Sequence, residues 1–121
     1  FADLISHSLY LFRSRPNIMA AYRRRWSWVL IDEYQDTNHA QTELVKLLVG
    51  HKPNLTVVGD DDQAIYAWRG ATIENLAKLT TDYPQIRLVK LEQNYRSSQS
   101  ILAAANHVIA KNPKLFEKKL Y

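Results

Sequence analysis

The chain has 121 residues, 46% of them hydrophobic, which is the size of one modest globular domain or of part of a larger one. Its 16 Lys and Arg against 12 Asp and Glu give a net charge of +4, which permits a nucleic-acid partner without requiring one. The absence of cysteine excludes disulfides and thiolate zinc sites. No apolar run reaches the roughly 20 residues of a membrane span, and signal-peptide features are lacking. Without an initiator Met, and starting inside a predicted helix, the chain is expected to be an excised fragment.

The N-terminal part is predicted to be helical. Residues 2–12 carry apolar side chains at helical spacing. Pro16 and Asn17 interrupt that pattern, and residues 18–22 suit a short second helix. The basic run at residues 23–25 favours a solvated helix end.

Strands and helices are expected to alternate after that. Short apolar runs predict three buried strands, at residues 26–31, 55–58 and 86–91. Helices are expected at residues 41–49 and 72–79 and between Ser98 and Asn112. This order implies an α/β fold, in which a parallel sheet carries helices on both faces. A basic tail, residues 114–121, ends the chain.

Each of these helices has candidate residues at its ends. Gly50 stands where the helix at residues 41–49 is expected to end. Polar side chains that cap helices precede each predicted start. The candidate caps are Thr37 or Asn38, then Thr72, then Ser97 or Ser98.

Polar clusters follow all three predicted strands. They are Asp32–Glu33, residues 59–63 and residues 92–96. Because the carboxyl ends of parallel strands meet at one edge of a sheet, where ligands gather, this convergence predicts a functional site.

The first cluster lies in WVLIDEYQD. A buried strand that delivers Asp32 to its end suits a Mg²⁺ ion on nucleotide phosphates, held directly or through water. Glu33 is placed to orient or deprotonate an attacking water. The alternative is a plain polar loop after a strand.

The second cluster begins VVGDDDQ. Gly59 permits a tight turn after the strand. The three carboxylates at residues 60–62 cannot all face one ion, so some must cap the next turn or bind other side chains. Gln63 has both a donor and an acceptor for a phosphate oxygen or a water.

The same cluster continues with AIYAWRG. Tyr66 and Trp68 suit stacking on nucleic-acid bases, and Arg69 suits a DNA phosphate or a nearby aspartate. The alternative is that Ile65, Tyr66 and Trp68 belong to the hydrophobic core.

The third cluster is LEQNYRSS. Arg96 is a candidate arginine finger for a transferring phosphoryl group, and Tyr95 a candidate stacking partner for a purine ring. The alternative is a surface arginine paired with Glu92.

Together the three strings closely resemble the superfamily 1 helicases of the UvrD/Rep/PcrA type. VLIDEYQDTN resembles their Walker B motif (motif II), VVGDDDQAIYAWRGA resembles motif III and LEQNYRSS resembles motif IV, in the family's order. DLI near the start resembles the DFDDL-like segment upstream of motif II. NYRSSQSILAAAN and FEKKLY look closest to the Rep branch.

The resemblance implies ATP-driven 3′→5′ translocation on single-stranded DNA with unwinding of duplex, on a RecA-like (P-loop NTPase) helicase core. By motif position it assigns Asp32 to Mg²⁺, Glu33 to the catalytic base and Gln63 to sensing the γ-phosphate. Gln35 and Asp36 receive supporting roles. The other implied contacts are DNA bases for Tyr66 and Trp68, DNA or the nucleotide site for Arg69, the adenine for Tyr95 and the γ-phosphate for Arg96.

One departure from the family concerns the phosphate-binding loop. The pattern G-x-x-x-x-G-K-[ST] does not occur in these residues, whose glycines are Gly50, Gly59 and Gly70. We therefore expect the chain alone to be inactive as an ATPase. The resemblance implies that residues 1–90 form the C-terminal half of the first RecA-like domain, and that residues 91–121 hold motif IV and the start of the second.

The cofactors implied by the resemblance are ATP and Mg²⁺. The implied partners are single-stranded DNA, duplex junctions, the rest of the helicase chain, and replication or repair proteins, in a nucleoid-associated protein of the bacterial cytoplasm. Alternatives are the helicase part of a helicase–nuclease, a degenerate binding module and an unrelated magnesium phosphohydrolase. The degenerate module is expected to lack some of Asp32, Glu33, Gln63 and Arg96, and the phosphohydrolase has no need of paired rings.

Overall fold

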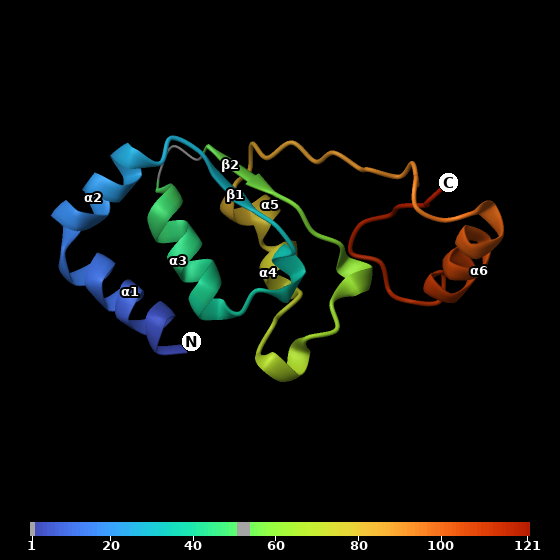
Figure 1. Ribbon diagram of the computed structural model, residues 1–121, viewed down its shortest axis with the longest axis horizontal. Helices are drawn as coiled ribbons and strands as arrows, with labels where there is room; N and C mark the ends of the chain where they lie inside the picture. Colours follow the sequence, from blue (N-terminus) through green and yellow to red (C-terminus); the bar gives the residue numbers. More distant parts are fainter. Residues whose placement is uncertain (1, 51–53) are drawn as a thin grey trace.

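The structure is a computed structural model that describes residues 2–50 and 54–121. Figure 1 shows an elongated arrangement, with α1 and α2 at one end, α6 at the other and a small sheet between them. Among the described residues, no helix has the length and apolarity to cross a bilayer. The elements are α1 (Ala2–Ser14), α2 (Pro16–Arg25), β1 (Val29–Ile31), α3 (His39–Val49), β2 (Leu55–Val57), α4 (Glu74–Ala77), α5 (Leu79–Asp82) and α6 (Gln99–Ile109), with 3₁₀ turns η1 (Tyr34–Asp36), η2 (Asp61–Gln63) and η3 (Ala67–Arg69).

The sheet consists of β1 and β2, which are parallel as predicted. Val29 pairs with Leu55 and Ile31 with Val57. Backbone hydrogen bonds continue beyond the strands, because the N–H of Val58 donates to the carbonyl of Ile31 at 2.8 Å and the N–H of Tyr34 donates to the carbonyl of Val58 at 3.0 Å. The two loops that leave the strands are therefore held side by side.

The core lies against the inner face of this sheet. Tyr34, Leu76 and Leu79 are its most buried members, and Ile31 and Val57 pack against them. Phe116, far along the chain, packs against the same cluster. The two outer residues of each strand face inward and are half-buried, while the middle residue is exposed, so these strands are not buried as the sequence predicted.

The prediction of helices on both faces of the sheet is wrong for the described residues. The middle residues Leu30 and Thr56 are exposed on the outer face, with Leu30 at 72%. There the indole N–H of Trp28 donates to the hydroxyl of Thr56 at 3.1 Å. Two short strands present few residues, and the described helices pack only beneath them.

The predicted third strand at residues 86–91 is also absent. The segment is extended, and it runs across the top of Figure 1 without pairing to another strand among the described residues. Leu88, Val89 and Leu91 are 57–82% exposed. An apolar run becomes a strand only when a neighbouring backbone satisfies its N–H and C=O groups, and here none does.

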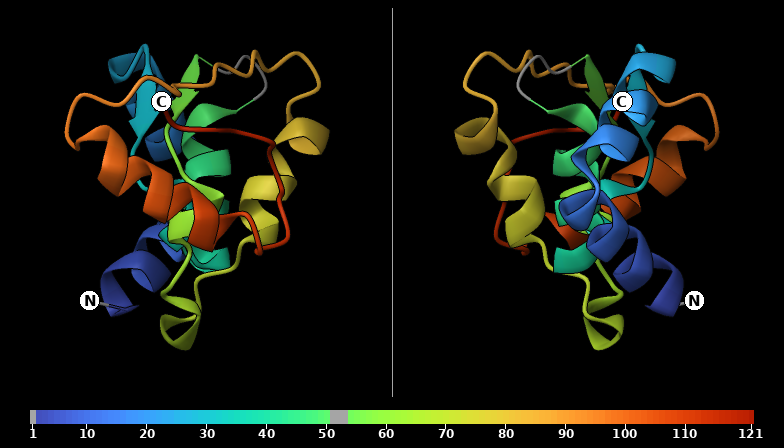
Figure 2. Two further views of the ribbon diagram at one scale, coloured as in Figure 1. Left: turned by 90° about the vertical axis from the view of Figure 1, so that its right-hand side faces the viewer. Right: turned by 90° about the vertical axis from the view of Figure 1, so that its left-hand side faces the viewer.

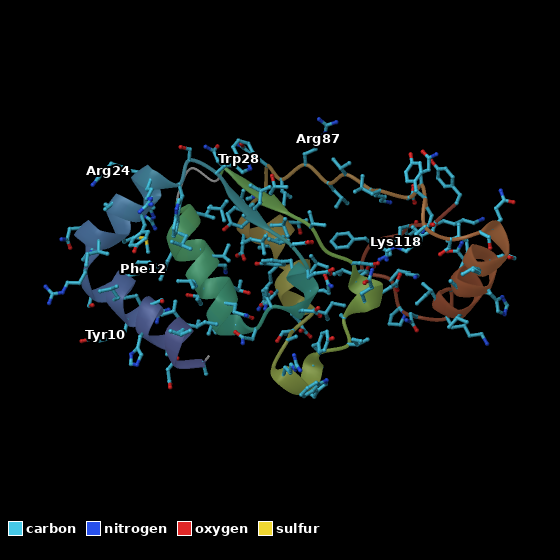
Figure 3. All side chains as sticks on the ribbon, in the orientation of Figure 1. Tyr10, Phe12, Arg24, Trp28, Arg87 and Lys118 are labelled. Atoms are coloured by element: carbon cyan, nitrogen blue, oxygen red, sulfur yellow. The ribbon has the colours of Figure 1, made fainter. Side chains whose placement is uncertain are left out.

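The helices at the N-terminal end and around α3 agree with their sequence signals. Asn38 caps α3 in a capping box with Gln41, and Gly50 ends the helix with a positive φ of 68°. α2 is longer than predicted, because Pro16 begins it at a position where proline is favoured. Aromatic packing of Phe12 against Tyr22, with ring centroids 5.4 Å apart, joins α1 to α2 (Figure 3).

The later helices depart from prediction. The helix expected at residues 72–79 is two short helices, α4 and α5, and Thr72 does not cap either with its side chain. Ser98 occupies the N-cap position of α6 without a side-chain hydrogen bond to the helix. Of the apolar side chains of α6, Leu102 is buried while Ile101 and Val108 are exposed.

Candidate nucleotide and DNA site

The loop after β1 presents two exposed carboxylates, Asp32 and Glu33. Oδ1 of Asp32 accepts a hydrogen bond from the backbone N–H of Glu33 at 2.9 Å. Glu33 has a φ of 50°, the only positive value for a non-glycine residue in the described part of the chain. Such a backbone costs of order 1–3 kcal/mol and persists only where its surroundings impose it. The direction of the Glu33 side chain is therefore fixed by the contacts of this turn.

The loop after β2 carries Gln63 at the end of the turn η2. Asp60 caps this turn, because its Oδ1 accepts from the N–H of Asp62 at 3.1 Å. Its other oxygen, Oδ2, accepts from Nε2 of Gln63 at 2.7 Å. Asp60 thus holds the exposed Gln63 side chain, which keeps its amide oxygen and a second N–H for a ligand.

A buried amide joins the two loops. Gln35 is 1% exposed, and its Nε2 donates to Oε2 of Glu33 at 2.7 Å while its Oε1 accepts from the N–H of Asp60 at 3.0 Å. A Cβ on Gly59 would lie 3.1 Å from that same Oε1. Glycine at position 59 therefore serves the close approach of the loops, and its backbone does not adopt the left-handed conformation that would require glycine for the predicted turn.

The acidic triplet (Asp60, Asp61 and Asp62) is covered by the C-terminal segment, residues 113–121. Lys118 forms ion pairs with all three carboxylates, the one with Asp62 at 3.2 Å, and Lys114 pairs with Asp62 at 2.9 Å. Figure 3 labels Lys118 at this contact. The triplet therefore meets lysines, which agrees with the expectation that some of its members bind other side chains.

Backbone groups complete this contact. Oδ2 of Asp61 accepts from the N–H groups of Leu115 at 3.0 Å and Phe116 at 3.3 Å. Both views of Figure 2 show the C-terminal segment, in red, folded back over the body of the molecule. Sequence reasoning missed this docking and treated the segment as a basic tail. The signal that could have indicated it was the run of three adjacent carboxylates, which need positively charged partners, in a chain with an excess of Lys and Arg over Asp and Glu.

These pairings decide between two candidate metal positions. The triplet offers carboxylate oxygens within 4.8 Å of one another, but lysines and backbone N–H groups already occupy them. In contrast, the carboxylate of Asp32 is exposed, and its one hydrogen bond among the described residues is to its neighbour's N–H. Its oxygens suit Mg²⁺, which takes one or two protein carboxylates and keeps several waters.

The aromatic residues after η2 lie on the surface. Tyr66 is 37% and Trp68 73% exposed, and Ile65 is exposed as well, so the alternative that these residues form core is wrong. The ring centroids of Tyr66 and Trp68 are 6.3 Å apart. The guanidinium carbon of Arg69 lies 4.5 Å from the Trp68 ring centroid and 5.2 Å from that of Tyr66. A cation between two exposed rings suits bases together with a phosphate backbone.

The third cluster does not join the first two. Because no third strand forms, Tyr95 and Arg96 lie in the segment before α6. Figure 1 shows that segment apart from the end of β1. Tyr95 is 86% exposed, and the N–H of Arg96 donates to Oδ1 of Asn94 at 2.9 Å. The alternative pairing of Arg96 with Glu92 is not formed among the described residues, where Glu92 instead accepts from the N–H of Lys119.

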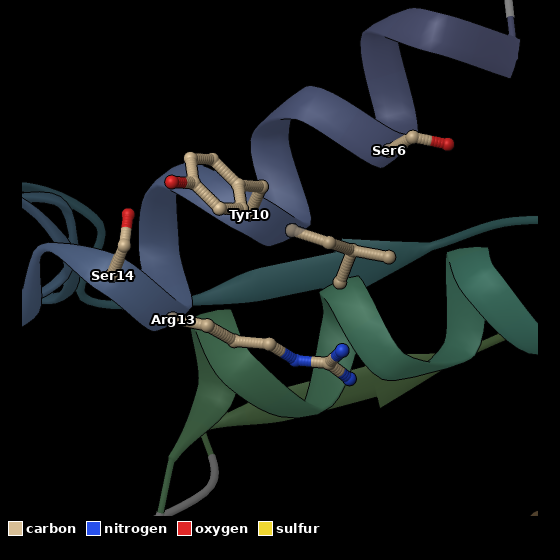
Figure 4. A pocket seen from close by; sticks show the side chains of 5 residues that line it. Ser6, Tyr10, Arg13 and Ser14 are labelled. Carbon is tan, nitrogen blue, oxygen red and sulfur yellow. The ribbon is translucent and has the colours of Figure 1, made fainter.

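A separate hollow is lined by residues of α1 alone, and Figure 4 shows it from close by. There the guanidinium of Arg13 points toward α3 and bonds Glu43 at 3.3 Å. This ion pair between helices is structural, and we assign the hollow no chemistry. Its lining residues are Ser6, Leu9, Tyr10, Arg13 and Ser14.

Comparison with known proteins identifies the class. The family described as "UvrD/REP helicase N-terminal domain" matches residues 1–84, and the chain belongs to that family. It is 52% identical over 121 residues to the ATP-dependent DNA helicase Rep of Escherichia coli. It is 53% identical over 128 aligned residues to the ATP-dependent DNA helicase UvrD1 of Mycobacterium bovis, and 50% identical to the ATP-dependent DNA helicase PcrA of Leuconostoc citreum.

These alignments cover 100% of the chain, but only 18%, 17% and 16% of the Rep, UvrD1 and PcrA relatives. The chain therefore spans less than a fifth of the curated relatives it matches. The near-equal identities do not separate the Rep branch from the others.

The acidic triplet generates a first prediction. Lys118→Ala removes the cation that contacts all three carboxylates. Asp61, which is buried, then loses its ion pair. Charge-assisted hydrogen bonds contribute about 1.5–3 kcal/mol, so we expect hydrogen exchange at the Leu115 and Phe116 amides to quicken roughly tenfold or more. Lys119→Ala, which removes a neighbouring exposed side chain, is the control. Unchanged protection in Lys118→Ala would show that the ion pairs do not hold the segment.

The pH dependence of this docking is a second prediction. Burial raises the pKa of Asp60 and Asp61, but the hydrogen bonds and charge of Lys118, together with bonds from Gln63 and from backbone N–H groups, outweigh it and hold both pKa values below the ordinary Asp value. Burial lowers the pKa of Lys118, but its bonds to Asp60 and Asp61 outweigh that and raise it.

The signs follow from linkage. The carboxylates stabilise docking fully above the ordinary Asp pKa of about 3.9, and this contribution is lost as pH falls through the lowered values. The lysine contributes below its ordinary pKa of about 10.4 and stops only as pH rises through the raised value. We expect the NMR signals of the Phe116 ring to stay constant between about pH 5 and 9 and to shift below about pH 4. A transition centred near neutral pH would contradict the assignment.

Proposed function

We propose that this chain is part of an ATP-dependent 3′→5′ DNA helicase, in which it binds Mg-ATP and links hydrolysis to movement along single-stranded DNA. One observation carries the proposal: Gln35 joins the acidic loop after β1 to the loop after β2, and that loop leads directly to the exposed rings. Membership of the helicase family, and relatives named as ATP-dependent DNA helicases, support the same function.

The nucleotide end comprises Asp32, Glu33 and Gln63. Asp32 would hold Mg²⁺, which supplies positive charge at the phosphates when bound. Glu33 would accept a proton from the attacking water, and the free amide positions of Gln63 would contact the γ-phosphate. The exposure of all three side chains supports this division of roles.

The DNA end comprises Tyr66, Trp68 and Arg69. The two rings would stack on successive bases, and Arg69, between them, would contact a phosphate or the nucleotide site. Gln63 and the DNA end lie within residues 63–69. A movement of the DNA against the rings would therefore displace Gln63 and change its contact with the γ-phosphate.

The remaining assignments rest on motif position alone. Tyr95 would pack on the adenine and Arg96 would reach the γ-phosphate as an arginine finger. Residues 1–90 would belong to the first RecA-like domain and residues 91–121 to the start of the second, in the Rep branch. Without a phosphate-binding loop in its sequence, the 121-residue chain alone would be inactive. The whole protein would act at duplex junctions in replication or repair, in the bacterial cytoplasm.

A third prediction tests the catalytic base. In the full-length helicase, Glu33→Gln keeps the size of the side chain but removes its ability to accept a proton. General-base catalysis is typically worth 10²–10⁴-fold, so we expect kcat for ATP to fall by about 100-fold or more, with nucleotide affinity within about twofold. Glu74→Gln, an exposed glutamate on α4, is the matched control. Turnover of Glu33→Gln at the control's rate would remove Glu33 from this role.

A fourth prediction tests the DNA end. Stacking contributes about 1–3 kcal/mol per base, so Trp68→Ala should weaken single-strand affinity by about fivefold or more and reduce DNA-stimulated turnover. Basal nucleotide binding should not change, because among the described residues the ring contacts of Tyr66 and Trp68 are with each other and with Arg69. Tyr10→Ala, which removes an exposed ring on α1, serves as the control. A loss of thermal stability in Trp68→Ala without loss of DNA affinity would contradict the assignment.

A further inference from the structure

The buried side chain of Gln35 has a pairing that its position in the motif does not explain. Its two polar ends are both satisfied by groups of the proposed site, with Nε2 on the Glu33 carboxylate and Oε1 on the Asp60 N–H. The orientation of this amide follows from chemistry, because a carboxylate only accepts and a backbone N–H only donates. A flip of the amide, which would exchange its oxygen and its nitrogen, would therefore break both hydrogen bonds.

These bonds extend into a chain that links two proposed catalytic groups. Glu33 bonds Gln35, Gln35 bonds the backbone of Asp60, and the Asp60 carboxylate bonds Gln63. Gly59 leaves room for this arrangement, because a Cβ there would crowd Oε1 of Gln35. Glu33 and Gln63 thus lie at opposite ends of one hydrogen-bonded chain that crosses the sheet edge.

From this geometry we propose that Gln35 is a positioning residue for hydrolysis: its amide fixes the Glu33 carboxylate relative to the loop that carries Gln63. The proposal rests on the proposed function, since it assumes that Glu33 is the base. One oxygen of Glu33 is bound by Gln35, which leaves the other for water. An amide suits this task because it orients the carboxylate without taking up its proton.

The left-handed backbone of Glu33 strengthens the argument. A glutamate at a φ of 50° is strained, and nothing in its own sequence favours that conformation. The bond from Gln35, two residues on, closes the turn around the strained residue. A misplacement of about 1 Å at a reacting group can cost of order 100-fold in rate, so a modest loss of this bond should be visible in kcat.

Two substitutions in the full-length helicase separate the two ends of the amide. Gln35→Glu keeps an oxygen for the Asp60 N–H but removes the N–H donor that contacts Glu33. Gln35→Leu removes both. We expect both variants to lower kcat for ATP by about 10- to 100-fold, with KM within about twofold. Hydrogen exchange at the Asp60 amide should stay slow in Gln35→Glu and quicken about tenfold in Gln35→Leu.

Controls assign each outcome. Gln41→Glu makes the same change in the capping box of α3, where a carboxylate is also accepted, and should leave kcat unchanged. If Gln35→Glu, with its Asp60 amide protected, turns over like Gln41→Glu, Gln35 is only a structural anchor and the inference is overturned. An equal loss of ATP binding and kcat also overturns it, because that pattern reports a damaged site. Failure of the proposed function is recognised separately, by Glu33→Gln retaining full turnover.

Discussion

A single buried amide, that of Gln35, connects the two loops on which the proposed chemistry depends. Parallel pairing of β1 and β2 brings the loops together, and the hydrogen bonds of Val58 extend that pairing past the strand ends. A buried polar side chain left without partners would cost about 1–3 kcal/mol, and here each loop supplies one partner. The absence of a side chain at Gly59 allows the approach. Moving either loop would break these bonds, so the loop that carries Asp32 and Glu33 and the loop that carries Gln63 are positioned together.

The acidic triplet poses an electrostatic problem that the C-terminal segment solves. Three carboxylates beside a site proposed for ATP phosphates and DNA phosphates would repel both. Lys114 and Lys118 offset two of the three negative charges, and Phe116 anchors the segment in the same core that supports the sheet. The loop after β2 can therefore keep its capping carboxylate at Asp60 and still present Gln63 and the rings to anionic ligands. Docking of a segment more than 50 residues away in sequence thus becomes part of the site's chemistry.

Local patterns allowed much of this to be predicted from the sequence. The strand pair, the acidic residues at strand ends and a cap for α3 at Thr37 or Asn38 follow from periodicity and turn chemistry within a few residues. The prediction of a strand at residues 86–91 was wrong, because a strand needs a neighbouring backbone to pair with and the composition of the segment cannot reveal one. The pairing of Lys118 with the triplet was missed because it joins residues 56 to 58 positions apart. The two hydrogen bonds of Gln35 depend on two loops meeting, so only the structure shows them.

The most direct test is a structure of the full-length helicase bound to Mg²⁺ and a non-hydrolysable ATP analogue. The proposed arrangement predicts Mg²⁺ bound by Asp32, directly at about 2.1 Å or through one water, on the side of the sheet edge where Glu33 and Gln63 lie. It also predicts a Gln63 amide group within hydrogen-bond distance of the γ-phosphate, with the two bonds of Gln35 intact. Mg²⁺ held by the acidic triplet, or a nucleotide bound away from the ends of β1 and β2, would contradict it.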